Sequence, residues 1–146
     1  MADAALSPVP DWRALVGAVS SPALPDRLAV ARAVRDGLPF EDARRMEEAG
    51  LLDVDLLVEH GVIPRRTWTH ARAQGVLSAQ LAQRVTRWLR ISALARETFG
   101  PDKDRAWLIR PTSALGGAAP VALLDTEEGA RAVELLLGRI AHGIAA

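Results

Sequence analysis

Apolar residues recur at spacings of three and four along most of the chain, which is the pattern of helices that bury one face. The longest pattern follows Ser78, a good amino-terminal cap, and predicts a helix over 79–99. The last pattern predicts a helix that begins after Asp125 or Thr126 and runs through His142. Its buried stripe is expected to consist of Val133, Leu137, Ile140 and Ile144.

Shorter segments are predicted to be helical as well, because each is bounded by a capping residue, a glycine or a proline. In the helix predicted over 24–35, Leu28, Ala31 and Val34 are expected to face inward. No run alternates β-branched or aromatic residues as a strand does. The predicted fold class is therefore all-α. The other short segments lie over 12–19, 40–49, 53–60, 65–74, 102–109 and 119–124.

Gly100-Pro101 is the best candidate for a domain boundary. Glycine suits the position after a helix end, and proline cannot continue the helix. We expect one domain over 23–100 and a second, smaller helical domain over 101–146. Residues 1–22 contain several prolines and are expected to form a flexible arm followed by a short helix.

The chain has 18 basic and 18 acidic side chains, but they are unevenly distributed. Residues 1–61 have a balance of −5, residues 62–100 a balance of +6, and residues 101–146 a balance of −1. The middle segment owes its charge to seven arginines against one glutamate. It is the one segment whose charge favours a polyanionic partner.

Signals for catalysis are weak. The 146 residues include no cysteine, and His60, His70 and His142 lie on separate predicted elements. No phosphate-binding loop or nucleophile turn is present, and Gly116-Gly117 is read as a tight turn in preference to a phosphate site. We expect no enzyme activity, no metal and no cofactor.

The longest uncharged stretch, 111–124, is too short and too interrupted to cross a membrane, and the amino terminus lacks the features of a secretion signal. These features predict a soluble cytoplasmic protein.

The segment from Val54 to Gln74 has the outline of a helix-turn-helix, with a tight turn at Gly61-Val62-Ile63. The second helix of such a unit enters the major groove of DNA. Trp68 has the spacing of the interior face and is expected in the core. A solvated surface helix is the alternative, and along the next helix Arg84, Arg87 and Arg90 suit either a phosphate backbone or a solvated face. The candidate DNA-binding residues are Arg65, Arg66, Thr67, Thr69, His70 and Arg72.

The carboxyl-terminal residues carry a specific ordered set of motifs over about 45 positions. The set comprises Phe99-Gly100, Trp107-Leu108, Pro111, Leu115-Gly116-Gly117, Pro120, Leu123-Leu124, Thr126, Gly129, Val133, Leu137, Ile140 and Gly143. It resembles the toxin-binding domain of Xre/MbcA/ParS-type bacterial antitoxins.

The upstream part is similar to the Xre-like helix-turn-helix domain of the same antitoxins. The matching positions are Gly37-Leu38-Pro39, Arg65-Arg66-Thr67, Gly75, Leu77-Ser78, Arg84, Arg87, Ala95 and Phe99-Gly100. Two positions depart from the family pattern. Gly61 lies one place earlier than the usual Gly-Ile pair, and Trp68 replaces the usual leucine or similar residue.

The resemblance implies an antitoxin of a type II toxin–antitoxin system. Its partner would be a RES-domain toxin that consumes NAD⁺ or transfers ADP-ribose, and the carboxyl-terminal domain would cover the toxin's active site. The helix-turn-helix would repress the shared operon by binding operator DNA, with the chain as a homodimer within a hetero-oligomer. The residues expected to contact the toxin are Arg139, His142, Gly143, Ile144, Ala145 and Ala146.

Two other functions fit the same residues. One is a helix-turn-helix transcriptional regulator without a toxin partner, in which the carboxyl-terminal part serves dimerisation. The other is a helical adaptor that binds neither DNA nor a toxin. Helix capping by Arg139 and His142 is the structural alternative to toxin contact at these positions.

Overall fold

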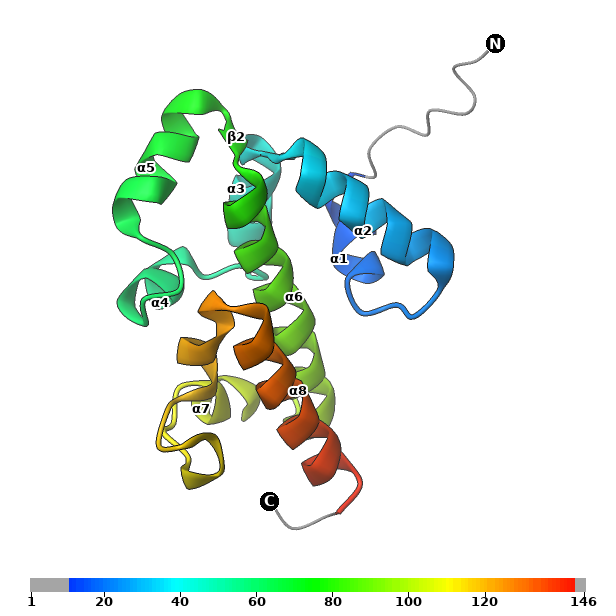
Figure 1. Cartoon of the computed structure of the whole chain (residues 1–146), viewed down its shortest axis with the longest axis vertical. Coiled ribbons are helices and arrows are strands. Elements are labelled where there is room, and N and C mark those ends of the chain that lie inside the picture. The colour runs from blue at the N-terminus through cyan, green and yellow to red at the C-terminus, as the bar shows by residue number, and fades with distance from the viewer. Residues whose placement is uncertain (1–10, 144–146) are drawn as a thin grey trace.

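Helix α6, Ala79–Phe99, is the axis around which the other elements pack (Figure 1). The computed structural model describes residues 11–143. The remaining helices are α1 (Trp12–Ala18), α2 (Leu24–Asp36), α3 (Phe40–Glu48), α4 (Val54–Glu59), α5 (Arg65–Gln74), α7 (Asp104–Leu108) and α8 (Glu127–Ala141). Two 3₁₀ helices, η2 (Ser113–Leu115) and η3 (Pro120–Asp125), and two short strands, β1 (Leu38–Pro39) and β2 (Val76–Leu77), complete the described chain.

The ends and the inner face of α6 are as the sequence predicts. The Ser78 hydroxyl accepts a hydrogen bond from the Leu81 amide at 3.2 Å, and Gly100 ends the helix with a φ of 88°. Of the residues that recur at spacings of three and four along this helix, Leu81, Val85, Trp88 and Ala95 are buried, and Ser92 and Phe99 are half-buried.

Helices α1 and α2 form a hairpin beside the upper half of α6 (Figure 1). The predicted inner face of α2 is wrong in part, since Leu28 is 54% exposed and Ala31 is exposed. The helix is rotated so that Val30, Ala33 and Val34 face the core instead. That rotation leaves Leu24 and Leu28 at the surface. The loose arm expected before Asp11 lies outside the described residues.

A two-residue antiparallel sheet, which the sequence did not predict, joins the chain before α3 to the chain after α5. Leu38 pairs with Leu77, and Pro39 pairs with Val76. Gly37 precedes β1 with a φ of 86°, and a Cβ atom there would lie 2.7 Å from the Leu77 carbonyl oxygen. Glycine is therefore required at this close approach. The strands are too short to show an alternating pattern.

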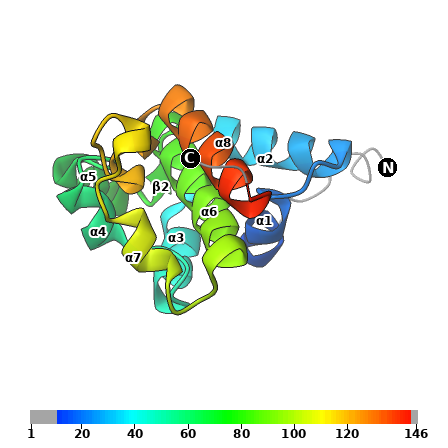
Figure 2. The same ribbon diagram turned by 90° about the horizontal axis from the view of Figure 1, so that it is seen from below.

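The carboxyl-terminal part packs on the lower half of α6, with α7 and α8 on different sides of it (Figure 2). Helix α7 begins at Asp104, two residues after the start of the segment predicted over 102–109. The segment expected over 119–124 is the 3₁₀ helix η3. Thr126 is the cap of α8, because its hydroxyl accepts a hydrogen bond from the Gly129 amide at 3.0 Å.

Helix α6 shares a continuous hydrophobic core with the elements on both sides of Gly100. Fully buried side chains include Leu57 and Ile63 upstream and Leu124 and Val133 downstream. The all-α fold class is confirmed. Within residues 11–143 no helix is both long and apolar enough to span a membrane.

Candidate functional site

Helices α4 and α5 and the turn between them pack together as one unit. The Asp53 carboxylate caps α4 by accepting the Leu56 amide at 3.0 Å. After α4, Gly61 adopts a φ of 77°, and the amide of Val62 donates to the Leu57 carbonyl at 2.8 Å. The side chains of Val62 and Ile63 are fully buried below the turn. The two helices are therefore held by buried apolar residues, as a helix-turn-helix requires.

Helix α5 buries one face and exposes the other. Trp68 is buried, as predicted, with its ring centroid 5.0 Å from that of Phe40, and Ala71 is buried beside it. The six predicted DNA-binding residues, Arg65, Arg66, Thr67, Thr69, His70 and Arg72, are all exposed. The structure thus brings these six side chains together on the outer surface of one helix.

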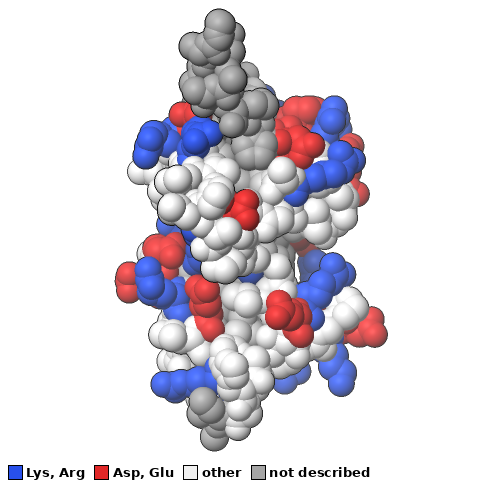
Figure 3. Space-filling model, turned by 90° about the vertical axis from the view of Figure 1, so that its right-hand side faces the viewer, with Lys and Arg blue, Asp and Glu red and all other residues white. Residues whose placement is uncertain are grey.

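The outer surface of α5 is basic, with the acidic side chains of Asp55 and Glu47 near Arg65 and Arg72 respectively. A guanidinium nitrogen of Arg65 lies 3.5 Å from a carboxylate oxygen of Asp55, and both side chains are mostly exposed. An ion pair of this kind is weak in water, so a phosphate can displace Asp55. The opposite side of the molecule differs, because basic and acidic groups are interspersed there without a broad area of one sign (Figure 3).

Arg84, Arg87 and Arg90 of α6 make contacts within the chain, and both predicted roles are wrong for Arg87, which is buried. Arg84 donates to the Val62 carbonyl at 3.0 Å and so supports the turn. Arg87 is 9% exposed and donates to Glu127 at the start of α8 and to two carbonyls at the end of η3. Arg90 pairs with Glu127 at 3.2 Å and with Glu134 at 3.6 Å. These side chains hold α6 to its neighbours.

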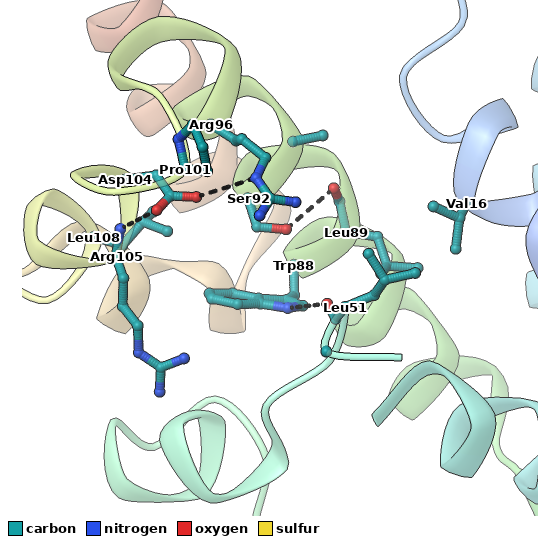
Figure 4. Close-up of a pocket in the computed structure, with 12 residues that line it drawn as sticks. Val16, Leu51, Trp88, Leu89, Ser92, Arg96, Pro101, Asp104, Arg105 and Leu108 are labelled. Carbon is teal, nitrogen blue, oxygen red and sulfur yellow. Dashed lines mark hydrogen bonds and ion pairs between the residues drawn. The ribbon is translucent and has the colours of Figure 1, made fainter. Parts of the chain in front are cut away.

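A cavity of about 290 Å³ lies where α6 meets α7 and the chain before α4 (Figure 4). On its wall the Trp88 indole nitrogen donates to the Leu51 carbonyl at 2.9 Å, and Arg96 lies 3.9 Å from Asp104. Arg105, also on the wall, pairs with Asp53. Among the described residues no group of histidine, aspartate and glutamate side chains is arranged to hold a metal. The cavity's polar groups serve contacts between elements.

Gly116 and Gly117 form a tight turn, with φ values of 70° and 88°. The Gly116 amide donates to the Ser113 carbonyl at 3.0 Å, and the Gly117 amide donates to the Thr112 carbonyl at 2.9 Å. Both amides are used inside the turn, so a phosphate would have to displace these bonds. The turn interpretation is the one that the hydrogen bonds support.

The carboxyl-terminal helix α8 also has two different faces. Val133 and Leu137 of the predicted stripe are buried and Ile140 is half-buried, whereas Arg139, His142 and Gly143 are exposed. Of the predicted toxin contacts, Ile144, Ala145 and Ala146 lie outside the described residues.

The sequence analysis missed Leu135, which is 68% exposed on the side of α8 that carries Arg139 and His142. The sequence did contain a signal for this exposure: Leu135 lies half a helical turn away from the stripe of Val133 and Leu137 and therefore on the outer face.

Residues 94–143 match the model of the antitoxin Xre/MbcA/ParS C-terminal toxin-binding domain. The match spans the end of α6 and the whole of α7, η2, η3 and α8. The carboxyl-terminal part of the chain is therefore similar to this toxin-binding domain. The exposed side of α8 lies within the segment that matches this toxin-binding domain.

Three curated proteins to which this chain is similar are each named antitoxin Xre. The protein from Photorhabdus laumondii is 39% identical over 92 residues, 62% of each chain. The protein from Yersinia enterocolitica is 38% identical over 85 residues, 56% of this chain and 57% of its own. The protein from Pseudomonas putida is 27% identical over 124 residues, 84% of this chain and 77% of its own. The chain thus spans less than two thirds of the length of the first two relatives.

Proposed function

We propose that this protein is an antitoxin that neutralises a cognate RES-domain toxin and represses its own operon. The observation that carries the proposal is the match of residues 94–143 to a toxin-binding domain whose last helix exposes Arg139 and His142. The RES-domain partner comes from the resemblance of the carboxyl-terminal motifs to that antitoxin class. The protein would act in the cytoplasm as a binding protein and not as an enzyme.

In this proposal the end of α8 and the residues after it cover the toxin's active site. Arg139, His142 and Gly143 face outward, so they can meet a partner without disturbing the core. Ile144, Ala145 and Ala146 would follow into the cleft, where small side chains exclude substrate by occupancy. Small side chains have little conformational entropy to lose on binding.

The second part of the proposal is operator binding by α5. Its outer surface offers Arg65, Arg66 and Arg72 for phosphates or guanine, and Thr67, Thr69 and His70 for hydrogen bonds. Repression of a palindromic operator needs two such helices, so a homodimer within a toxin–antitoxin hetero-oligomer is part of the proposal.

The partner is tested by co-expression. The chain is produced with the proposed RES-domain toxin, which is sought in the neighbouring reading frames, and the pair is followed through size-exclusion chromatography. Co-elution of both proteins is the expected result. Separate elution, together with intact operator binding, would favour the other candidate: a helix-turn-helix regulator without a toxin partner, whose carboxyl-terminal part serves dimerisation. The exposed polar face of α5 supports that candidate equally well.

The division into a DNA-binding domain over 23–100 and a toxin-binding domain over 101–146 is also a proposal. Helix α6 packs on both parts, so the division depends on whether its upstream contacts suffice. A fragment of residues 1–100 should remain helical by circular dichroism and should no longer bind the toxin. An unfolded fragment would show that the two parts fold only together.

A further inference from the structure

Opposite charges meet where α4 and α5 begin. Arg65 is the first residue of α5, and Asp55 lies in the first turn of α4. A guanidinium nitrogen of Arg65 is 3.5 Å from a carboxylate oxygen of Asp55. Both helices lie at the same side of the molecule (Figure 1). Arg65 therefore has an acidic neighbour within its own helix-turn-helix.

The next arginine in the sequence has different surroundings. Arg66 is exposed, as Arg65 is, but it forms no ion pair within residues 11–143. Both arginines belong to the first turn of α5, where the recognition helix of a helix-turn-helix meets the base edges. Only Arg65 would approach DNA together with a carboxylate.

The start of α4 is acidic as a whole. Asp53 caps the helix, and Asp55 follows two residues later. Partial burial raises the pKa of Glu47 in α3, and the nearby carboxylates of Asp55 and Asp53 raise this pKa further. The first helix of a helix-turn-helix crosses the DNA backbone, so phosphates would come close to these carboxylates. Like charges at such distances repel each other.

The contact with Asp55 leaves Arg65 able to bind a base. Its 3.5 Å is longer than the about 2.7–2.9 Å of a charge-assisted hydrogen bond. The side chains of Arg65 and Asp55 are 65% and 90% exposed, so both can be reached from outside. A guanidinium has several N–H donors, and it can donate to O6 and N7 of a guanine while the carboxylate stays beside it.

We infer that Asp55 is a positioning residue that makes α5 favour its operator over unrelated DNA. On unrelated DNA, where Arg65 has no guanine in reach, its best partner is a phosphate. That phosphate would also lie close to the Asp55 carboxylate and be repelled by it. A guanine edge has no net charge and meets no such repulsion. Repulsion of the wrong partner is a general source of specificity, and the inference rests on the proposed operator binding by α5.

The variant Asp55→Asn tests the inference, because it removes the charge and keeps the size of the side chain. Fluorescence anisotropy with the full chain measures binding to the DNA upstream of the gene and to a duplex with the same bases in shuffled order. The variant should bind the shuffled duplex up to about fivefold more tightly, the scale of one charge pair at this distance in water. Its affinity for the upstream DNA should change less. On the shuffled duplex the salt dependence should steepen by about one phosphate contact.

Glu59→Gln is the matched control for the loss of one negative charge. Glu59 is exposed, lies one turn further along α4, and has His60 as its charged neighbour in place of an arginine. This variant should change the affinities for both duplexes by the same factor. The second control is the partner residue: Asp55→Asn should change the ratio of the two affinities in an Arg66→Ala background and should not change it in an Arg65→Ala background.

Equal strengthening on both duplexes by Asp55→Asn, as by Glu59→Gln, would overturn the inference. An effect on the ratio that persists in the Arg65→Ala background would also overturn it. If Asp55 only stabilises the start of α4, its replacement lowers the melting temperature and weakens binding to both duplexes equally, which excludes the inferred role.

The natural chain separates this inference from the proposed function. A natural chain that shows no preference for the upstream DNA contradicts operator binding itself, and the inference falls with it. A natural chain that prefers the upstream DNA, with the same preference in Asp55→Asn, contradicts the role of Asp55 alone.

Discussion

The carboxylate of Asp53 joins two helices that are far apart in the sequence. One oxygen accepts the Leu56 amide and caps α4, and the other pairs with the Arg105 guanidinium of α7. The first helix of the helix-turn-helix is therefore tied to the domain that matches the toxin-binding family. Close by, the Trp88 indole donates to the Leu51 carbonyl, so the chain before α4 is held to α6 as well.

The first prediction concerns the pH dependence of this contact. Partial burial acts to raise the pKa of Asp53, but the Leu56 amide and Arg105 together hold that pKa below its ordinary value. The ionised carboxylate therefore stabilises the fold. This contribution is complete above the unfolded-state pKa of about 3.9 and is lost as the pH falls through the lower folded-state value. Asp53→Ala should lower the unfolding free energy by about 0.5–2 kcal/mol at pH 7.

Urea denaturation at pH 7 and in strong acid measures the difference between Asp53→Ala and the natural chain. That difference should shrink in acid. Arg105→Ala is the control, because it removes only the partly exposed ion pair and should cost about 0.2–1 kcal/mol. A decrease in the unfolding free energy of Asp53→Ala that is equal at both pH values would contradict a role for the ionised carboxylate.

The sequence predicted the helices well and the contacts between them less well. Caps such as Ser78 and Thr126 act through hydrogen bonds to amides three residues later, so local sequence determines them. The rotation of α2 depends on which of its alanines and valines meets α6, and Leu28 is no less apolar than the residues that are buried. The ties of Arg87 to the start of α8 join residues about 40 positions apart, beyond the reach of local patterns.

The candidate site divides in the same way. The exposed face of α5 follows from the helical spacing of Trp68 and Ala71, which are buried, so its polar residues were predictable. The exposure of Leu135 and the open space around Gly138 depend on how α8 packs on α6 and η3. Only the packed structure shows which of the helix's leucines remains outside.

The second prediction concerns DNA. Arg65→Ala or Arg66→Ala should weaken operator binding by about 1–3 kcal/mol if that residue contacts a guanine. Fluorescence anisotropy on the DNA upstream of the gene measures the affinity, which should also fall steeply with salt. Arg110→Ala is a matched control, because Arg110 is exposed and lies outside α5. Unchanged affinity in the Arg65/Arg66 double variant would exclude α5 as the reading helix.

The third prediction compares two glycines of one helix. Gly129→Ala should destabilise the protein by about 1–3 kcal/mol, because its Cβ would collide with the Leu123 carbonyl. Gly138→Ala should stabilise the isolated chain by up to about 1 kcal/mol, because alanine fits a helix better and meets no atom there. Thermal denaturation in dilute solution measures both changes. Equal shifts in the same direction would contradict the packing described for α8.

The fourth prediction concerns the end of the chain. Deleting residues 142–146 should leave the helical content unchanged, because the buried residues of α8 all precede this segment. The deletion should weaken toxin inhibition by roughly 1.5–3 kcal/mol, the effect of burying one isoleucine side chain. Leu137→Asp is the opposite case, since it places a charge in the core and should abolish inhibition through unfolding. If the shortened chain inhibits the toxin as well as the full chain does, the toxin must contact another part of the chain, such as the Leu115–Pro120 turn.

The consumption of NAD⁺ by the proposed RES-domain partner is the most direct test of the proposed antitoxin activity. The measurement follows NAD⁺ over time with the toxin alone, with the full chain added at equal concentration, and with Leu137→Asp added as a control. The proposal predicts that NAD⁺ falls with the toxin alone and with Leu137→Asp, and is preserved by the full chain. Loss of NAD⁺ at the same rate in the presence of the folded full chain would contradict it.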